Sequence, residues 1–467
     1  LSGVALEDDK KQRYGEIKSR LSELSSTFSN NVMDATLAWQ KHITDQAELA
    51  GLPESALDAA KQLAQSKELD GWLFTLDIPS YLGSAKKKAG KVVESNRSAS
   101  QWSGVKYAYR DARRYIERQG YILKGTEKIW DSSIANIGIL WVIEHARDKL
   151  EAYLEAVYAP FWRRELDIED VTVVAASITA AGVCADGFEA FQAGIGKQIH
   201  DQLQGQLHSN NIYGVPTYVI DGQILFGREH LPLVRWHLTG KQGDAPDIAY
   251  ELNDAPSLEL NAELGAKVTA QKNDIKLTLF IDFKSPAAYL ALKPTLDFIK
   301  THHLDVKWLP FPTKQSAIAA EQDNETKGET HRRVRAFQRQ QMHEMYAELS
   351  DTQMHFRSKP GNSDLALNVL ANLSVDPTSF ISRAYDAYWI EGKDLNDAAV
   401  VEQLVTDAGL RFSIDLLHSK AIDNCIEQAQ AQGVFEVPTF VIQQQLFIGR
   451  EHMPWLKEIV SEKKKCL

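Results

Sequence analysis

The stretch IDFKSPAAYL at residues 281–290 joins the end of a strand to the start of a helix. Apolar residues over 275–283 predict a buried strand, and Ser285 followed by Pro286 is typical of a helix start, where proline loses no hydrogen bond. Residues 304–311 predict a second strand after the helix. Because a helix connects these strands, we expect a right-handed βαβ unit with parallel strands.

Residues 328–431 are mainly helical in pattern, and two short strands follow at 437–442 and 446–448 before a last helix from Met453. A βαβ half, a helical insertion and a ββα half are the layout of the thioredoxin fold with an inserted helical subdomain. The predicted class is therefore α/β.

A repeat divides the chain. YGVPTYVI at 213–220 returns as FEVPTFVI at 435–442, and GREH at 227–230 returns at 449–452 with the same offset. Phe161-Trp162 is matched further upstream by Tyr388-Trp389. The offset is 222 for the first two matches and 227 for the third, and motifs repeated in the same order indicate homologous modules. We define module 1 as residues 73–240, a linker as 241–272, module 2 as 273–460 and a basic tail as 461–467.

Composition excludes several classes of protein. The 467 residues carry 52 Lys and Arg against 63 Asp and Glu, a net charge of −11, which disfavours nucleic-acid binding. Apolar runs such as 137–143 are far shorter than the roughly 18 to 20 residues of a membrane span, so no membrane partner is expected. The 3 cysteines are isolated and the 13 histidines lack metal-ligand spacing, so neither a CxxC pair nor a metal site is predicted. With no secretion leader visible, we expect a cytoplasmic protein.

Module 2 resembles a known family through IDFKSPAAYL, Tyr388-Trp389 and VPTF at 437–440. It is similar to the serine-bearing branch of the DsbA-like superfamily, which comprises 2-hydroxychromene-2-carboxylate isomerase and the kappa-class glutathione transferases. Residues 96–239 resemble the same family, but no Ser-Pro-x-x-Tyr helix start precedes them. The resemblance implies two tandem thioredoxin-like modules with helical insertions, the first lacking its Ser-bearing βα unit.

Residues 1–72 differ in kind. Ile17, Leu21, Leu24 and Phe28 recur at helical spacing, which predicts an all-α segment. Residues 14–82 are similar to the N-terminal helical region of oligopeptidase A. The chain lacks the His-Glu-x-x-His helix that such zinc peptidases need. A fragment or fusion of oligopeptidase A without its zinc site is thus a remote alternative for the chain's function.

Ser285 is the candidate catalytic residue. At the start of a helix its hydroxyl lies among unpaired amides at the positive end of the helix dipole. A serine cannot exchange disulfides, and the resemblance implies that it donates a hydrogen bond to a glutathione thiolate. The alternative is that Ser285 only caps the helix.

The resemblance implies further contacts for glutathione and its substrate. Val215-Pro216 and Val437-Pro438 are expected as cis bonds that leave the valine backbone free to pair with glutathione; an ordinary trans proline at a strand start is the alternative. Arg450 and Glu451 occupy the place of the family's γ-glutamyl contacts, or else form a solvated helix start. The candidate substrate pocket is lined by Tyr289, Tyr388 and Trp389, with Trp162 in module 1, although such aromatics are more often core.

Two hypotheses follow. The first is a glutathione-dependent isomerase or transferase acting on a small aromatic or acidic substrate, with Ser285 at the active helix start. The second is a catalytically silent thioredoxin-fold protein that binds peptides or partners at its Val-Pro edges.

Overall fold

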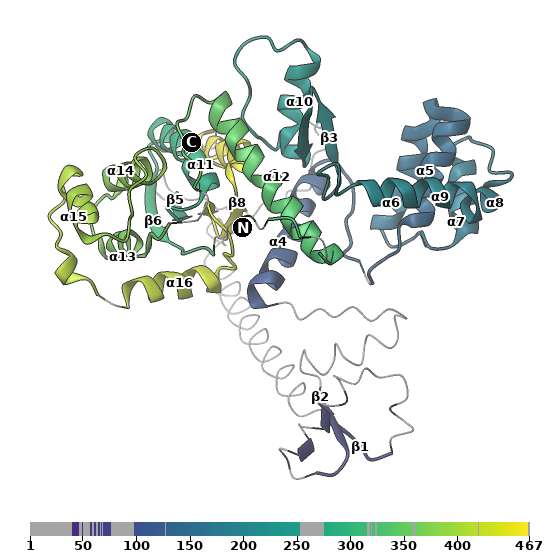
Figure 1. Ribbon diagram of the computed structural model, residues 1–467, viewed down its shortest axis with the longest axis horizontal. Coiled ribbons are helices and arrows are strands. Elements are labelled where there is room, and N and C mark those ends of the chain that lie inside the picture. Colours follow the sequence, from purple (N-terminus) through teal and green to yellow (C-terminus); the bar gives the residue numbers. More distant parts are fainter. Residues whose placement is uncertain are drawn as a thin grey trace, which may run out of the picture. The chain divides into compact units, whose positions relative to one another are not determined.

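The computed structural model describes residues 98–252 except 127, and residues 275–465 except 315–317, 319, 323–324, 358–360 and 419, together with scattered positions between 40 and 75 (Figure 1). The chain divides into two compact units. One comprises residues 1–97 and 259–269, and the other comprises residues 98–258 and 270–467.

The first unit contains a two-stranded antiparallel ribbon. β1 (Gln40–Ile43) pairs with β2 (Trp72–Thr75). The expectation of an all-α segment is corrected here, because WLFT at 72–75 is rich in residues that favour strands and its backbone groups find partners in β1. Leu57, Ala60 and Ala64 are helical, as a helix after Pro53 requires. The helical pattern at 17–28 lies outside the described residues.

Module 2 contains a four-stranded sheet in the order β6-β5-β7-β8. Its strands are β5 (Lys276–Ile281), β6 (Asp305–Pro310), β7 (Thr439–Ile442) and β8 (Gln445–Ile448). β5 and β6 are parallel and are joined through α11 (Pro286–His302), which confirms the predicted βαβ unit. β7 pairs antiparallel with β5 on one side and with β8 on the other.

Helices of module 2 surround this sheet (Figure 1). They are α12 (Lys327–Leu349), α13 (Asp364–Asn372), α14 (Thr378–Trp389), α15 (Ala398–Asp407), α16 (Ala421–Ala431) and α17 (Met453–Lys465), with short turns η4 (Ile414–Leu416) and η5 (Arg450–His452). Phe280, Phe283, Phe380, Phe440 and Phe447 have no exposed surface. Burying such a ring stabilises the fold by roughly 1.5–3 kcal/mol, so this cluster is the main core.

Among the described residues, module 1 has a helical insertion like that of module 2 and a smaller sheet, without a counterpart of α11. Its described strands, β3 (Thr217–Ile220) and β4 (Gln223–Phe226), form a two-stranded sheet. We call α5 to α9 the helical subdomain of module 1; these helices form a cluster with a core of their own (Figure 1). Module 1 contains α4 (Ala99–Arg118), α5 (Ser133–Ala146), η2 (Arg147–Lys149), α6 (Leu150–Trp162), α7 (Val171–Ala180), α8 (Phe188–Ala193), α9 (Ile195–Gln206), η3 (Arg228–His230) and α10 (Leu231–Leu238). Among the described helices of both modules, none is long and apolar enough to span a bilayer.

Each module sends one long helix onto the other. From α4 of module 1, the Tyr115 hydroxyl lies 2.7 Å from Nδ1 of His452 and the Tyr107 hydroxyl lies 2.9 Å from its Nε2. From α12 of module 2, the Tyr346 hydroxyl lies 2.8 Å from Nδ1 of His230. The two histidines are equivalent positions of the repeated GREH motif. The modules therefore exchange equivalent contacts, which the repeat alone did not predict.

Replacing Tyr115 by Phe should lower the free energy of unfolding of the full chain by about 1–3 kcal/mol, because one nitrogen of buried His452 loses its partner. Chemical denaturation of the variant and of wild type measures this difference. Tyr121→Phe is the control, since Tyr121 is exposed and makes only a long hydrogen bond to Glu155. Equal losses in the free energy of unfolding for both substitutions would contradict a stabilising role of the Tyr115–His452 hydrogen bond.

Candidate functional site

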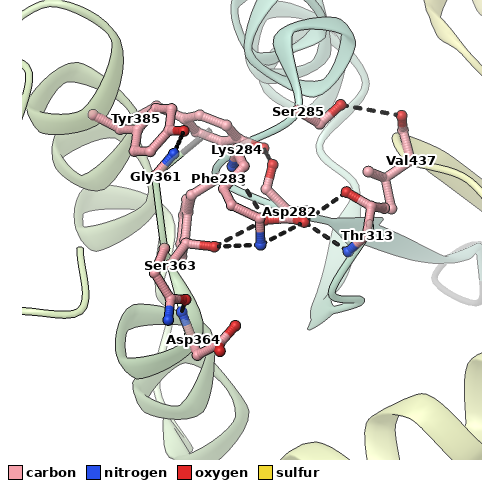
Figure 2. A network of polar contacts seen from close by, with 12 residues as sticks. Asp282, Phe283, Lys284, Ser285, Thr313, Gly361, Ser363, Asp364, Tyr385 and Val437 are labelled. Carbon is pink, nitrogen blue, oxygen red and sulfur yellow. Dashed lines mark hydrogen bonds and ion pairs between the residues drawn. The ribbon is translucent and has the colours of Figure 1, made fainter. Parts of the chain in front are cut away.

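Ser285 lies at the N-terminus of α11 and contacts the Val437-Pro438 segment. Its Oγ accepts a hydrogen bond from Ala288 N at 3.2 Å and donates one to the carbonyl oxygen of Val437 at 3.4 Å (Figure 2). The side chain caps α11, which was the alternative to a catalytic role. It also contacts Val437, which lies 152 residues away in the chain. With 5% of its surface exposed, Ser285 lies at a closed junction.

Both predicted Val-Pro bonds are cis, which confirms that expectation. The two copies have different surroundings. Val437 is 3% exposed and faces Ser285, whereas Val215 is 81% exposed. No counterpart of Ser285 lies beside Val215 among the described residues. The structure thus brings a hydroxyl and a Val-Pro segment together in module 2 only.

A buried polar network holds the turn that carries Ser285. The carboxylate of Asp282 is fully buried and accepts hydrogen bonds from Thr313 N, Thr313 Oγ1 and Ser363 Oγ at 2.7–3.0 Å. The Lys284 ammonium lies 3.2 Å from Asp282 Oδ2 and donates to Ser363 Oγ at 3.1 Å (Figure 2). In addition, Ser285 N donates to the carbonyl oxygen of Asp282. A buried charge pair of this kind tolerates little change in geometry, so it fixes the start of α11.

This network was not predicted from the sequence. An Asp and a Lys two residues apart, in a stretch otherwise predicted to be buried, were the available signal. Their partners Thr313 and Ser363 come from the loop after β6 and from the residue before α13, and no local pattern connects these positions to Asp282.

The three aromatic residues expected at a substrate pocket lie in the core instead. Tyr289, Tyr388 and Trp389 are 3–8% exposed. The Trp389 indole donates to the carbonyl oxygen of Phe283 at 3.0 Å, and the Tyr289 hydroxyl donates to Asp386 at 3.0 Å. This corrects the pocket hypothesis: large rings gain more by packing against the sheet than by lining an open space.

Arg450 and Glu451 contact the linker. The Arg450 guanidinium binds both carboxylate oxygens of Asp247 at 2.9–3.0 Å through Nε and is itself 5% exposed. The linker also bridges the two GREH motifs, since Ala249 N donates to the Glu229 carbonyl and Tyr250 N donates to the Glu451 carbonyl. The expected γ-glutamyl contact of Arg450 is corrected: an internal carboxylate already occupies its guanidinium.

The Glu451 carboxyl has a strongly perturbed pKa. Burial, reinforced by the nearby Glu229 and opposed by Arg450, raises the pKa of Glu451 to about 8. Burial likewise raises the pKa of Glu229, and burial lowers the pKa of His452 well below its usual range. The Glu451 carboxyl thus favours the protonated form near neutral pH.

The described cavities lie away from Ser285. One of about 340 Å³ opens in the helical subdomain of module 1, and a neighbouring one of about 270 Å³ shares its Thr126, Trp130 and Phe161 walls. Trp162 is one of the residues that line the larger cavity, whereas a core position was the more common expectation for such aromatics. Among the described residues no cluster of His, Cys, Asp or Glu has the arrangement of a metal site.

Asp282→Ala should lower the free energy of unfolding by about 3–5 kcal/mol, because it leaves the buried Lys284 ammonium without its counter-charge. Lys284→Met should cost only about 1–2 kcal/mol, since Asp282 keeps its hydrogen bonds from Thr313 and Ser363. Urea denaturation of the full chain measures both changes, with the exposed Asp415→Ala as control. A smaller loss for Asp282→Ala than for Lys284→Met would refute this description of the network.

The raised pKa of Glu451 predicts a pH dependence of stability. An unfolded Glu ionises near its ordinary pKa of 4.5 while folded Glu451 keeps its proton to about pH 8, so its contribution to stability falls with rising pH across that window and levels off above it. Glu451→Gln should therefore gain stability relative to wild type, by at least about 1 kcal/mol, as the pH rises from 6 to 8. Denaturation at several pH values measures this gain.

The matched control for that series is Glu348→Gln, which removes an exposed carboxylate from α12. Its stability relative to wild type should stay constant over the same range. A constant difference for Glu451→Gln as well would show that Glu451 is ionised in the folded protein at pH 6.

Sequence comparison relates the N-terminal part of the chain to oligopeptidase A. It is 66% identical over 82 residues to the enzyme of Escherichia coli and 67% identical to that of Haemophilus influenzae, and each match covers 18% of this chain. The chain spans only 12% of the length of these relatives. The resemblance noted from the sequence is therefore confirmed for this segment alone.

Solved structures show weak likeness. 2-Hydroxychromene-2-carboxylate isomerase has a TM-score of 0.32 and 15% identity, over 40% of this chain and 95% of that chain. A probable DsbA oxidoreductase from Streptomyces coelicolor has a TM-score of 0.32 and 14% identity, over 41% of this chain and 90% of that one. These values are too low to support an argument about function.

The model of the DSBA-like thioredoxin domain matches the chain twice, at residues 85–239 and 276–461. The two matches coincide with the two copies of the repeat and together cover well over half of the chain. With the βαβ unit, the helical insertion and both cis prolines in place, the chain belongs to the family of DSBA-like thioredoxin domains.

Proposed function

We propose that module 2 binds glutathione and uses it for isomerase or transferase chemistry on a small aromatic or acidic substrate. The observation that carries this proposal is the contact between the Ser285 hydroxyl and the Val437 carbonyl at the start of α11. In the isomerase version, the glutathione sulfur forms a C–S bond to the substrate and the same bond breaks after rotation. Substrate and product are then isomers, and the thiol is recovered without an oxidant or reductant.

The residues that would contact the glutathione sulfur are suited to a thiolate. The Ser285 hydroxyl points to the Val437 carbonyl over a long 3.4 Å contact, so a thiolate could replace that acceptor at little cost. The Val437 amide has no hydrogen-bond partner among the described residues, which leaves it available to an extended peptide such as glutathione. The N-terminus of α11 favours a negative charge at this point.

The residues that were expected at the γ-glutamyl end of glutathione are less suited to that group. Arg450 is paired with Asp247, and Glu451 lies close to Glu229. A γ-glutamyl group would have to find other contacts or displace Asp247. The proposal therefore assigns the glutathione contact to Ser285 and Val437, with Pro438 as the bend between them and β7.

A second candidate function is a catalytically silent module that binds peptides or partners. Two observations favour it: Ser285 is 5% exposed, and the aromatic residues expected around a substrate are in the core. Module 2 would then offer a folded surface rather than a reaction site. Binding of glutathione by the wild-type chain separates the two candidates.

Ser285→Ala should weaken glutathione binding by about ten- to a hundred-fold, because a hydrogen bond to a charged group is worth about 1.5–3 kcal/mol. Isothermal titration of the full chain measures the affinity. Thr326→Ala is the matched control: it removes a capping hydroxyl from the start of α12 and leaves α11 intact. Unchanged affinity in Ser285→Ala, or no binding by wild type at millimolar glutathione, would reject the proposal in favour of the silent module.

A further inference from the structure

Helices α6 and α14 are equivalent in the repeat but differ in what covers them. Position by position, the residues of α6 that line the 340 Å³ cavity correspond to core residues of α14. The pairs are Tyr153 with Phe380, Leu154 with Ile381, Val157 with Ala384, Tyr158 with Tyr385, Phe161 with Tyr388, and Trp162 with Trp389. In module 2 this face is buried throughout. In module 1 Tyr153 and Val157 lie in the core of the helical subdomain, and among the described residues the outer part of the face, with Tyr158 at 55% exposure, is open.

In module 2 the unit formed by β5 and α11 covers this face. The Tyr385 hydroxyl donates to the Asp282 carbonyl at 3.3 Å, and the Trp389 indole donates to the Phe283 carbonyl at 3.0 Å. Ring contacts complete the cover, since Phe283 lies 5.2 Å from Tyr385 and Tyr289 lies 5.4 Å from it, centroid to centroid. Both acceptor carbonyls belong to the turn between strand and helix.

In module 1 the equivalent donors have nothing to bind. Tyr158 is 55% exposed, whereas Tyr385 is fully buried. Among the described residues, neither the Tyr158 hydroxyl nor the Trp162 indole nitrogen has a hydrogen-bond partner. An open apolar face with two unused donors at its rim is unusual for a surface that serves no contact.

The edge of β3 is a second surface of module 1 that lacks, among the described residues, the partner that its equivalent has in module 2. In module 2, β7 pairs with β8 on one edge and with β5 on the other. In module 1, β3 pairs with β4 and has no second partner among the described strands. Val219 on β3 is 64% exposed, and an unpaired edge of this kind is a template for an added strand.

One strand–helix unit covers both surfaces in module 2, because β5 pairs with β7 while the following turn and α11 contact α14. We propose that the β3 edge and the cavity face of α6 form a docking site for a strand–helix segment supplied by another polypeptide. Its strand would pair antiparallel with β3, its turn would offer carbonyls to Tyr158 and Trp162, and aromatic residues equivalent to Phe283 and Tyr289 would fill the cavity. Residues 275–303 of this chain are an example of such a segment.

The test uses the full chain and a fluorescently labelled peptide of residues 275–303. Anisotropy should show saturable binding, and hydrogen exchange should slow at the amides of both β3 and α6. Tyr158→Lys and Val219→Lys should each weaken binding at least ten-fold, and so should Phe283→Asp in the peptide. Since both protein side chains are exposed, these variants keep the fold; Leu416→Lys, at an equally exposed apolar residue of module 2, should leave binding unchanged.

A form with the same segment attached ahead of Leu1 through a Gly/Ser linker gives the site an effective concentration near the millimolar range, so weak affinity cannot hide binding. Slowed exchange at β3 and α6 in this form supports the proposal. If exchange slows at neither β3 nor α6, the proposal is overturned. Protection of α6 alone, or binding that the two lysine variants do not change, also overturns it and indicates a cavity for a small apolar ligand.

Discussion

The candidate site depends on the hydrogen bonds and the ion pair that the Asp282 carboxylate makes. This carboxylate has no contact with solvent, yet it collects donors from the loop after β6, from the residue before α13 and from Lys284 beside it. Three segments that are distant in the chain are thereby held at the end of β5. The start of α11, and with it the Ser285 hydroxyl, has its position because this charge must be satisfied in place.

The linker and the exchanged helices give the two modules a common centre. Histidines of both GREH motifs bind tyrosines of the opposite module, while Ala249 and Tyr250 bond to the glutamates of both motifs. A motif expected to contact a ligand is thus used for assembly within the chain. The half-buried Glu229 and Glu451 then belong to a module interface, and the protonation of Glu451 bears on its stability.

Local pattern was enough to predict the βαβ unit and the helical insertion, because strand alternation and the Ser285-Pro286 helix start are short-range signals. The two cis prolines were predicted from the family resemblance and from the repetition of Val-Pro-Thr. Ser285 and Val437 do meet, as the resemblance implied, but at a closed junction and not at the solvent-reachable pocket that the resemblance led us to expect. The prediction of a γ-glutamyl contact for Arg450 and of a pocket position for Trp389 was wrong. Both side chains are bound by partners, Asp247 and Phe283, that only the folded chain brings near. The β1–β2 ribbon was missed because strands of four residues carry almost no periodicity.

The exchange of helices α4 and α12 also has a thermodynamic consequence. When either module opens, the other loses the tyrosines that satisfy its buried histidine, so we expect the contacts to couple the unfolding of the two modules. A ligand that stabilises module 2 would then also protect the amides of module 1, although it touches none of them. In such a chain the two copies of the repeat would be linked energetically by the buried imidazole rings of His230 and His452.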